Sequence, residues 1–329
     1  MEQKILEIKD LETYFYSSRG VAKAVDKVSY SVGKGEILGI VGESGCGKSV
    51  TALSILRLVK CPPGKIVGGQ VLLDGKNLLE LTEKEMEAVR GNRISMIFQE
   101  PMTSLNPLLT VGDQIMEPLI KHRGMNKQDA KKEAIHMLEA VGIPNAERRF
   151  KEYPNSMSGG MRQRVMIAMA LCCDPEVLIA DEPTTALDVT IQAQILDLML
   201  NLRDKLGTSI IMITHDLGVV AEMCDRAAVM YCGSVVEEGP VKEIFKNPVH
   251  PYTKGLIASI PKLTTETERL FNIRGSVPSL LKLPEGCRFA DRCDHCTEQC
   301  RKQFPPLTKV SEGHNVRCYL NAGGEDHAE

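Results

Sequence analysis

The chain has 329 residues, which is long enough for one large domain or two smaller ones with an ample core. Its 40 basic and 43 acidic residues give a net charge of −3, so no global basic field favours binding to nucleic acid or to an anionic membrane. Trp is absent and aromatic residues make up 4%, which argues against base-stacking platforms and membrane-interface belts.

The N-terminal segment MEQKILEIKDLETYFY lacks the apolar core of a signal peptide, and no window approaches the roughly 18 apolar residues of a transmembrane helix. We therefore expect a cytosolic protein, in a compartment where stable disulfides are rare, and we expect any membrane contact to come through a partner. Residues 1–40 alternate apolar and polar positions between turn signals. This pattern predicts antiparallel strands that lead into a buried strand.

The segment GESGCGKS, residues 42–49, fits the phosphate-binding pattern G-x-x-x-x-G-K-[ST], between the apolar run ILGIV and an amphipathic helix. Its glycines allow backbone N–H groups to point inward and, with the helix N-terminus, to cradle phosphates. We expect Lys48 to reach the β and γ phosphates and Ser49 to ligate Mg²⁺. The predicted nucleotide-binding residues of this segment are Gly42, Glu43, Ser44, Gly45, Cys46, Gly47, Lys48, Ser49 and Val50.

Residues 112–172 are mostly helical in pattern, and the segment MSGGMRQR within them predicts a second anion site. Ser158 stands where a helix should start, and Gly159 and Gly160 leave the first N–H groups of that helix open to an anion. One chain that already has a phosphate loop does not need another phosphate site for its own nucleotide. We therefore interpret 158–160 as serving the nucleotide of another subunit.

The apolar run VLIADEP, residues 177–183, predicts a buried strand that ends in two carboxylates. Asp181 is expected to hold Mg²⁺ through water, and Glu182 to polarise an attacking water. Alone this is a weak signal, because acidic residues often occupy strand ends and helix caps, but the phosphate loop upstream favours a functional role. His215 follows the next apolar run, IIMIT, and that position favours function over a structural cap.

After about residue 247 prolines and cysteines become frequent and regular periodicity is lost, which predicts a domain boundary near 245–250. Five cysteines follow, spaced Cys287-x5-Cys293-x2-Cys296-x3-Cys300 and then Cys318. This is neither a zinc-ribbon pattern nor the run of bacterial ferredoxins, although four thiolates suit zinc or an iron–sulfur cluster. His314 is a weak candidate for a further ligand. The earlier cysteines, Cys61 and Cys224 among them, are expected to be small buried hydrophobes, apart from Cys46 in the phosphate loop.

Taken in order, these motifs resemble the ATP-binding subunits of ABC transporters, from about residue 4 to residue 245. The motifs are the loop 42–49, Gln99 of IFQEP, SGG at 158–160, the strand 177–182, TTALD at 184–188 and His215. The resemblance implies an α/β P-loop ATPase with an antiparallel β edge and an inserted helical subdomain at about 100–172. It also implies a head-to-tail dimer, with ATP between the phosphate loop of one subunit and the SGG signature of the other.

The resemblance also implies roles for single residues. Glu182 would be the catalytic base, Gln99 would sense Mg²⁺ and water and contact the membrane subunits, and His215 would contact the γ-phosphate. Asp188 would lie in the loop that couples the two sites. An aromatic near the end of the first strand would stack on adenine; we prefer Phe15, with Tyr16 next, and a core role is about as plausible for either.

Two further features resemble the oligopeptide/dipeptide branch of that family. Met161 follows SGG where the commonest signature has Gln, and the C-terminal segments HPYTKGLIASIP and GHNVRC match that branch. The branch implies a [4Fe–4S] cluster on Cys287, Cys293, Cys300 and Cys318, with zinc as the alternative and Cys296 as an extra thiol. The predicted domains are an ATPase at 1–246 and a small irregular extension carrying the four-cysteine site at 247–329.

The resemblance predicts an ATPase at the cytoplasmic face of the cell membrane that uses ATP and Mg²⁺ to power import of dipeptides or oligopeptides. The implied partners are a second, related ATPase subunit, two membrane permease subunits and, indirectly, an extracytoplasmic solute-binding protein, without nucleic acid. Nickel import by the same branch is the rival, because the substrate never touches this chain. A soluble ABC ATPase acting on ribosomes or DNA is less consistent with a single cassette that lacks a long coiled coil.

Overall fold

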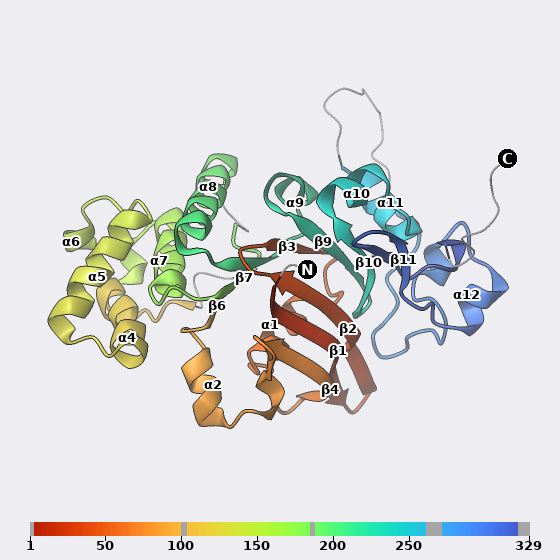
Figure 1. The fold of residues 1–329 in the computed structure, drawn as a ribbon, viewed down its shortest axis with the longest axis horizontal. Coiled ribbons are helices and arrows are strands. Elements are labelled where there is room, and N and C mark those ends of the chain that lie inside the picture. Colours follow the sequence, from red (N-terminus) through yellow and green to blue (C-terminus); the bar gives the residue numbers. More distant parts are fainter. Residues whose placement is uncertain (1–2, 100–103, 185–187, 261–271, 322–329) are drawn as a thin grey trace. The chain divides into compact units, whose positions relative to one another are not determined.

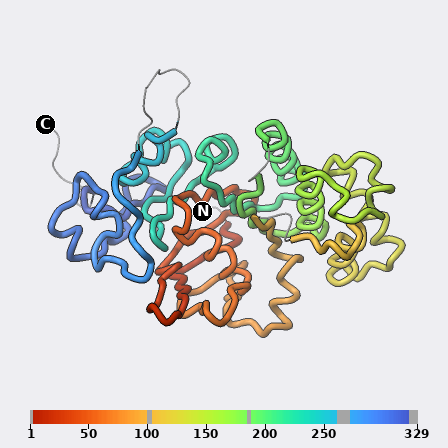
Figure 2. The backbone as a smooth tube through the Cα atoms, turned by 180° about the vertical axis from the view of Figure 1, so that it is seen from behind, coloured from red at the N-terminus to blue at the C-terminus, as the bar shows by residue number. Residues whose placement is uncertain are grey.

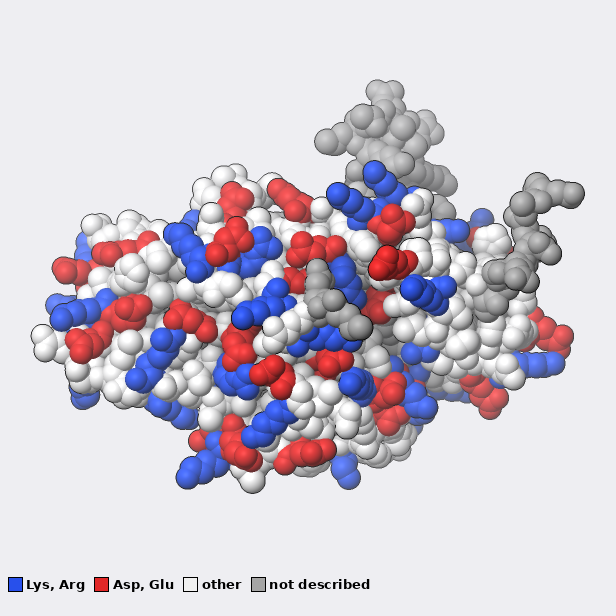
Figure 3. Space-filling model, viewed as in Figure 1, with Lys and Arg blue, Asp and Glu red and all other residues white. Residues whose placement is uncertain are grey.

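The computed structural model describes residues 3–99, 104–184, 188–260 and 272–321. The chain divides into two compact units, each built from several stretches of sequence. The first unit comprises residues 1–6, 32–37 and 73–213, and the second comprises 7–31, 38–72 and 214–329. Basic and acidic side chains are interspersed on the face shown in Figure 3.

The first unit combines a parallel sheet with a group of helices. Strand β7 (Val177–Asp181) pairs in parallel with β6 (Ile94–Ile97) on one side and with β8 (Ser209–Ile213) on the other. Every residue of β7 and β8 is buried, as expected for parallel strands covered on both faces. The carboxyl ends of these strands carry the polar residues that the sequence singles out.

Helices α4, α5, α6 and α7 occupy the stretch whose pattern predicts helices, and they gather in one cluster (Figure 1). Side-chain oxygens of Thr110, Asn126 and Ser158 cap the starts of α4, α5 and α7. The remaining elements of this unit are β5 (Lys76–Asn77), η1 (Leu78–Glu80), α2 (Glu83–Val89), α4 (Val111–Arg123), α5 (Lys127–Ala140), α6 (Ala146–Arg149), η2 (Pro154–Ser156), α7 (Gly159–Leu171) and α8 (Val189–Leu206).

The second unit contains two sheets. The first has the strand order β2-β1-β4, in which β1 (Lys4–Ser17) and β2 (Gly20–Gly33) form a hairpin and β4 is Gly64–Leu73. In the second sheet β3 (Ile37–Val41) pairs in parallel with β9 (Arg226–Tyr231), which pairs antiparallel with β10 (Ser234–Pro240). Helix α1 (Lys48–Ile55) follows β3 after the phosphate loop.

The C-terminal part of the second unit is more regular than its sequence suggests. Strand β12 (His314–Val316) pairs with β10, and β11 (Thr308–Ser311) pairs with β12, so this segment extends the sheet (Figure 2). The other elements are α9 (Leu217–Met223), α10 (Val241–Lys246), α11 (Pro251–Ala258), η3 (Ala290–Arg292), α12 (Glu298–Lys302) and η4 (Tyr319–Asn321). In the part of the chain that the structure describes, no helix is long and apolar enough to cross a membrane.

Candidate active site

The loop between β3 and α1 has a backbone that suits glycine at three positions. Gly42, Gly45 and Gly47 have φ angles of 154°, 76° and 105°. A Cβ atom added at Gly42 would lie 2.2 Å from the carbonyl oxygen of Met230, and one at Gly47 would lie 2.2 Å from that of Ala24. Both the turning of the chain and the close approach of neighbouring backbone therefore require glycine here.

Lys48 is the first residue of α1, and its side chain turns back over this loop. Its Nζ donates to the carbonyl oxygens of Gly42, at 2.7 Å, and Glu43, at 3.2 Å, and the residue is 6% exposed. Burial raises the pKa of the neighbouring Cys46 thiol, although Lys48 opposes the shift, so this thiol is neutral at neutral pH. The loop thus presents a buried ammonium on a backbone that its glycines turn sharply, and both features suit a phosphate group.

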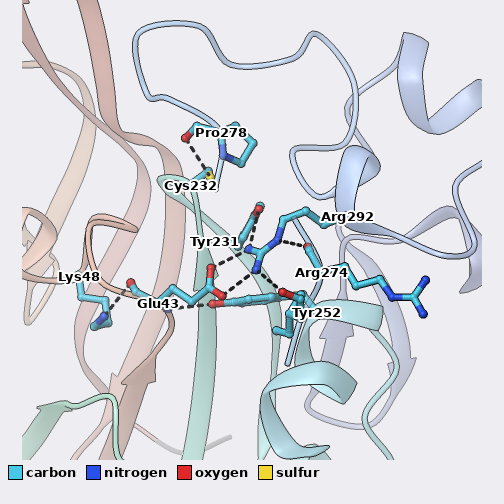
Figure 4. Close-up of polar contacts among 9 residues, drawn as sticks. Glu43, Lys48, Tyr231, Cys232, Tyr252, Arg274, Pro278 and Arg292 are labelled. Atoms are coloured by element: carbon cyan, nitrogen blue, oxygen red, sulfur yellow. Dashed lines mark hydrogen bonds and ion pairs between the residues drawn. The ribbon is translucent and has the colours of Figure 1, made fainter. Parts of the chain in front are cut away.

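Glu43, the second residue of the loop, is tied to segments far along the chain (Figure 4). Its N–H donates to the Tyr252 hydroxyl at 2.8 Å. Its carboxylate accepts a forked pair of hydrogen bonds from Arg292, at 2.8 and 3.0 Å, and this contact raises the pKa of the guanidinium. Sequence reasoning missed both contacts, because 209 and 249 residues separate the partners. The only signal in the sequence was that Tyr252 lies in HPYTKGLIASIP, which resembles the oligopeptide branch.

Gln99 and Glu182 meet in the first unit, at the carboxyl ends of the adjacent strands β6 and β7. The Gln99 Nε2 donates to the Glu182 carboxylate at 3.0 Å. Asp181, at the end of β7, is 4% exposed, and Glu182 after it has a φ of 47°. Left-handed backbone in a residue other than glycine is typical of functional sites, where surrounding structure holds the strain. The pair could together orient a water molecule for attack.

The remaining predicted residues of the first unit stand at helix starts. The Ser158 hydroxyl caps α7 by accepting from the N–H of Met161 at 3.4 Å, and Ser158 and Gly159 are exposed. Asp188 caps α8 by accepting from the N–H of Ile191 at 2.9 Å. Residues 185–187 of TTALD lie outside the described residues.

His215 and the candidate adenine contacts belong to the second unit. His215 is exposed in the connection that precedes α9. Tyr16 is 47% exposed, whereas Phe15 is partly buried and packs toward Gly64, where an added Cβ would lie 2.9 Å from its ring. Tyr14 donates to the Asp26 carboxylate at 3.0 Å. The choice between Phe15 and Tyr16 stays a prediction.

The four cysteines predicted as ligands line one small cavity, and Cys296 is not among its lining residues. Burial raises the pKa of Cys287 to about 11, and the nearby thiols act in the same direction. However, all the cysteines are free, and among the described residues no group of three or more His, Cys, Asp or Glu side chains is arranged to hold a metal ion. The described side chains therefore form no metal-binding group for the predicted [4Fe–4S] cluster or zinc. The lining cysteines are Cys287, Cys293, Cys300 and Cys318.

Two predictions about single residues differ from the structure. Cys61 is exposed rather than buried. His314 is buried, with its Nε2 2.8 Å from the Glu237 carboxylate, and it does not line the thiol cavity. His250 is likewise buried, at 1% exposed, and burial lowers its pKa to about 3.

Two family descriptions match the chain: "ABC transporter" over residues 25–185 and "Oligopeptide/dipeptide transporter, C-terminal region" over residues 236–300. The oligopeptide transport ATP-binding protein AppD of Bacillus subtilis (strain 168) is 54% identical over 316 residues, which are 96% of this chain and 96% of AppD. The chain belongs to the ABC transporter family. Dipeptide transport ATP-binding protein DppD of the same organism is 51% identical over 326 residues, covering 99% of this ABC protein and 97% of DppD.

A solved structure agrees. The dimeric, post-hydrolysis structure of the ATP-binding cassette MJ0796 bound to ADP and Pi has a TM-score of 0.63 and 30% sequence identity, and covers 72% of this chain and 98% of that one. These similarities confirm the predicted family, the ABC ATPase fold and the assignment of this ABC protein as an ATPase.

Proposed function

We propose that this ABC protein is the ATP-hydrolysing subunit that powers import of dipeptides or oligopeptides through a membrane permease. The observation that carries the proposal is similarity along nearly the whole chain to ATP-binding proteins named for oligopeptide and dipeptide transport, including a match to the C-terminal region of that branch. We assign residues 1–246 to the ATPase domain and 247–329 to the extension. The subunit works at the cytoplasmic face of the membrane.

The described contacts suggest how hydrolysis proceeds. When ATP binds, the Lys48 ammonium exchanges the carbonyl oxygens of Gly42 and Glu43 for phosphate oxygens, while loop N–H groups hold the rest of the phosphate chain. Mg²⁺, held by Ser49, Asp181 and Gln99, would neutralise the charge that develops on the phosphates.

Glu182 then accepts a proton from the attacking water. Gln99, already hydrogen-bonded to that carboxylate, orients the water. His215 contacts the γ-phosphate.

We also propose that two ATPase subunits, related but different, assemble head to tail, so that 158–160 of one binds the nucleotide held by 42–49 of the other. Asp188 couples the two sites. The dimeric state named for MJ0796 supports this arrangement. Two membrane permease subunits would complete the transporter, with an extracytoplasmic solute-binding protein acting indirectly. The exposure of Leu108 and Leu109, at 82% and 40%, supports contact with such a partner.

Replacing Glu182 by Gln tests the catalytic assignment. We expect ATP binding to persist and turnover to fall by about 100-fold or more, because an amide cannot accept the proton of water. Glu139→Gln, an exposed carboxylate on α5, is the matched control and should behave as wild type. Turnover that survives in Glu182→Gln would show that another group is the base.

Reconstitution tests the substrate. ATPase activity of the assembled transporter should rise with short peptides and a peptide-binding protein. Stimulation by nickel instead would favour the nickel-import alternative. Stimulation by ribosomes or DNA, with no permease bound, would overturn the transport proposal.

We further propose that Cys287, Cys293, Cys300 and Cys318 hold a [4Fe–4S] cluster, with zinc as the alternative. The support is that these four thiols line one cavity while Cys296 does not. A set of four thiolates is what either a [4Fe–4S] cluster or a tetrahedral zinc ion takes as ligands.

Protein purified without oxygen should absorb visible light and contain about four iron atoms per chain. Cys300→Ser should remove the absorption, whereas the control Cys296→Ser should keep it. A colourless, iron-free protein that holds zinc would favour the alternative. One that holds neither metal would refute the site.

A further inference from the structure

The proposed function gives no role to Arg292 of the C-terminal extension. Its guanidinium nevertheless binds the carboxylate of Glu43 in the phosphate loop (Figure 4). Its side chain is 5% exposed. Its Nη1 and Nη2 bind the two carboxylate oxygens of Glu43, and Nη1 also donates to the Tyr231 hydroxyl at 3.2 Å. Its Nε donates to the carbonyl oxygen of Arg274 at 2.9 Å. The bonds to Arg274 and Tyr231 thus help to hold the planar guanidinium in the orientation in which it binds the carboxylate.

Aromatic rings hold the same group from the side. The Arg292 guanidinium lies 5.8 Å from the ring centre of Tyr231 and 5.7 Å from that of Phe289. Tyr252, whose hydroxyl accepts from the N–H of Glu43, packs on Tyr231 with ring centres 4.6 Å apart. The backbone and the carboxylate of Glu43 thus rest on a single cluster of one guanidinium and three rings.

Glu43 in turn is fixed on three sides. Its N–H binds Tyr252, its carbonyl oxygen accepts from Lys48 at 3.2 Å, and its carboxylate binds Arg292. Glycine-rich loops lose more conformational freedom on ordering than other segments, and a ligand that must order the loop binds more weakly. A carboxylate in a loop that binds phosphates would also repel them unless a cation neutralised it.

We infer that Arg292 is a positioning residue that holds the phosphate loop in its ATP-binding conformation through Glu43. This inference rests on the proposed binding of ATP phosphates by 42–49. Because the contact joins Arg292 to Glu43 and does not touch the reacting atoms, it acts on ATP and ADP alike. It therefore changes nucleotide affinity rather than the rate of the chemical step.

The first test compares Arg292→Met with wild type by titration with a fluorescent ATP analogue and with ADP, followed by steady-state kinetics. We expect both nucleotides to bind about 5- to 30-fold more weakly, with KM raised and kcat within about twofold. The control is Arg301→Met, which removes an exposed ion pair with Asp291 in the same extension and should leave affinity unchanged. A merely structural role would reduce the fraction of protein that binds, without changing Kd, and that result would overturn the inference.

Arg292→Lys keeps the positive charge but loses the two-pronged guanidinium, so nucleotide binding should weaken by a factor between those of wild type and Arg292→Met. If Arg292→Met does not fold, the affinity of Arg292→Lys tests the inference in its place. A double-mutant cycle with Glu43→Gln adds a test of the route. If Arg292 acts through Glu43, the double variant loses less affinity than the product of the single losses. Losses that multiply, or unchanged affinity in the Lys variant, would overturn the inference. Failure of the wild type itself to bind ATP would instead refute the proposed function.

Discussion

The phosphate loop 42–49 and the signature segment 158–160 are both glycine-rich entries to a helix, yet their glycines meet different demands. In the loop the chain itself requires them, since Gly42 and Gly47 have positive φ and an added Cβ would fall 2.2 Å from a carbonyl oxygen at either. Gly159 has no positive φ, and no described atom lies within 4 Å of the position that its Cβ would take.

On the proposed head-to-tail assembly, the loop 42–49 holds the subunit's own nucleotide, whereas 158–160 is offered to the nucleotide of the other subunit. Glycine in a helix destabilises it by roughly 0.5–1 kcal/mol relative to alanine. Neither the φ angle nor a neighbour close to an added Cβ requires glycine at 159. The first N–H groups of this exposed helix have no side chain of residue 159 covering them, so they can bind an anion that comes from another molecule. In the proposed dimer, that is the phosphate chain held by the other subunit's loop.

The largest effect is expected in the loop. Gly47→Ala should weaken ATP binding by about 100-fold or more, since a φ of 105° and the clash with Ala24 both oppose the native backbone. Nucleotide titration and thermal unfolding would measure this. Gly45→Ala is the matched control, because Gly45 has a φ of 76° but no described atom within 4 Å of an added Cβ. Gly45→Ala should lose less affinity for ATP than Gly47→Ala. Equal losses of affinity would mean that the positive φ, and not the clash with Ala24, causes the whole effect.

A different outcome is expected at the signature. Gly159→Ala should leave ATP binding by the isolated subunit unchanged and should leave the free energy of unfolding equal or up to about 1 kcal/mol higher. ATPase turnover of the assembled transporter should nevertheless fall by about tenfold or more, because the methyl group covers N–H groups offered to the partner's phosphates. Normal turnover in Gly159→Ala would remove the evidence for a shared site.

The same contrast explains what the sequence could reveal. The phosphate loop is predictable because its strand, glycines, lysine and helix follow one another within a short stretch of sequence, so the local pattern contains all the residues that shape it. Glu182 was singled out alone, and the Gln99 contact emerges because β6 and β7 are neighbours in the sheet. The Arg292–Glu43 pair has no local signal, because its two residues stand 249 positions apart in the sequence and only the folded chain brings them together.

The errors have a similar origin. An apolar neighbourhood in sequence did not bury Cys61, which stands exposed beside Pro62. Conversely, His314 looked like a loop residue near Cys318, but the pairing of β12 with β10 carries it inward to Glu237. Burial of this kind depends on strand pairing between distant segments, which periodicity within one segment does not report.

Gly160 offers the smallest and most discriminating change, because it combines both demands. An added Cβ would lie 3.1 Å from Cγ2 of Ile191 in α8. Overpacking in Gly160→Ala should therefore offset the gain of up to about 1 kcal/mol that alanine brings to a helix, and the free energy of unfolding should not rise. Ile191→Ala removes that neighbour, and the double variant should be no less stable than Ile191→Ala alone, which a urea-unfolding cycle would show. On the proposal of a shared site, turnover should stay low in the double variant, since removing the Ile191 side chain does not restore the bare backbone that the partner's phosphates would approach. If relieving the clash restored turnover as well, Gly160 would serve packing within its own chain, and the shared site would rest on Ser158 and Gly159.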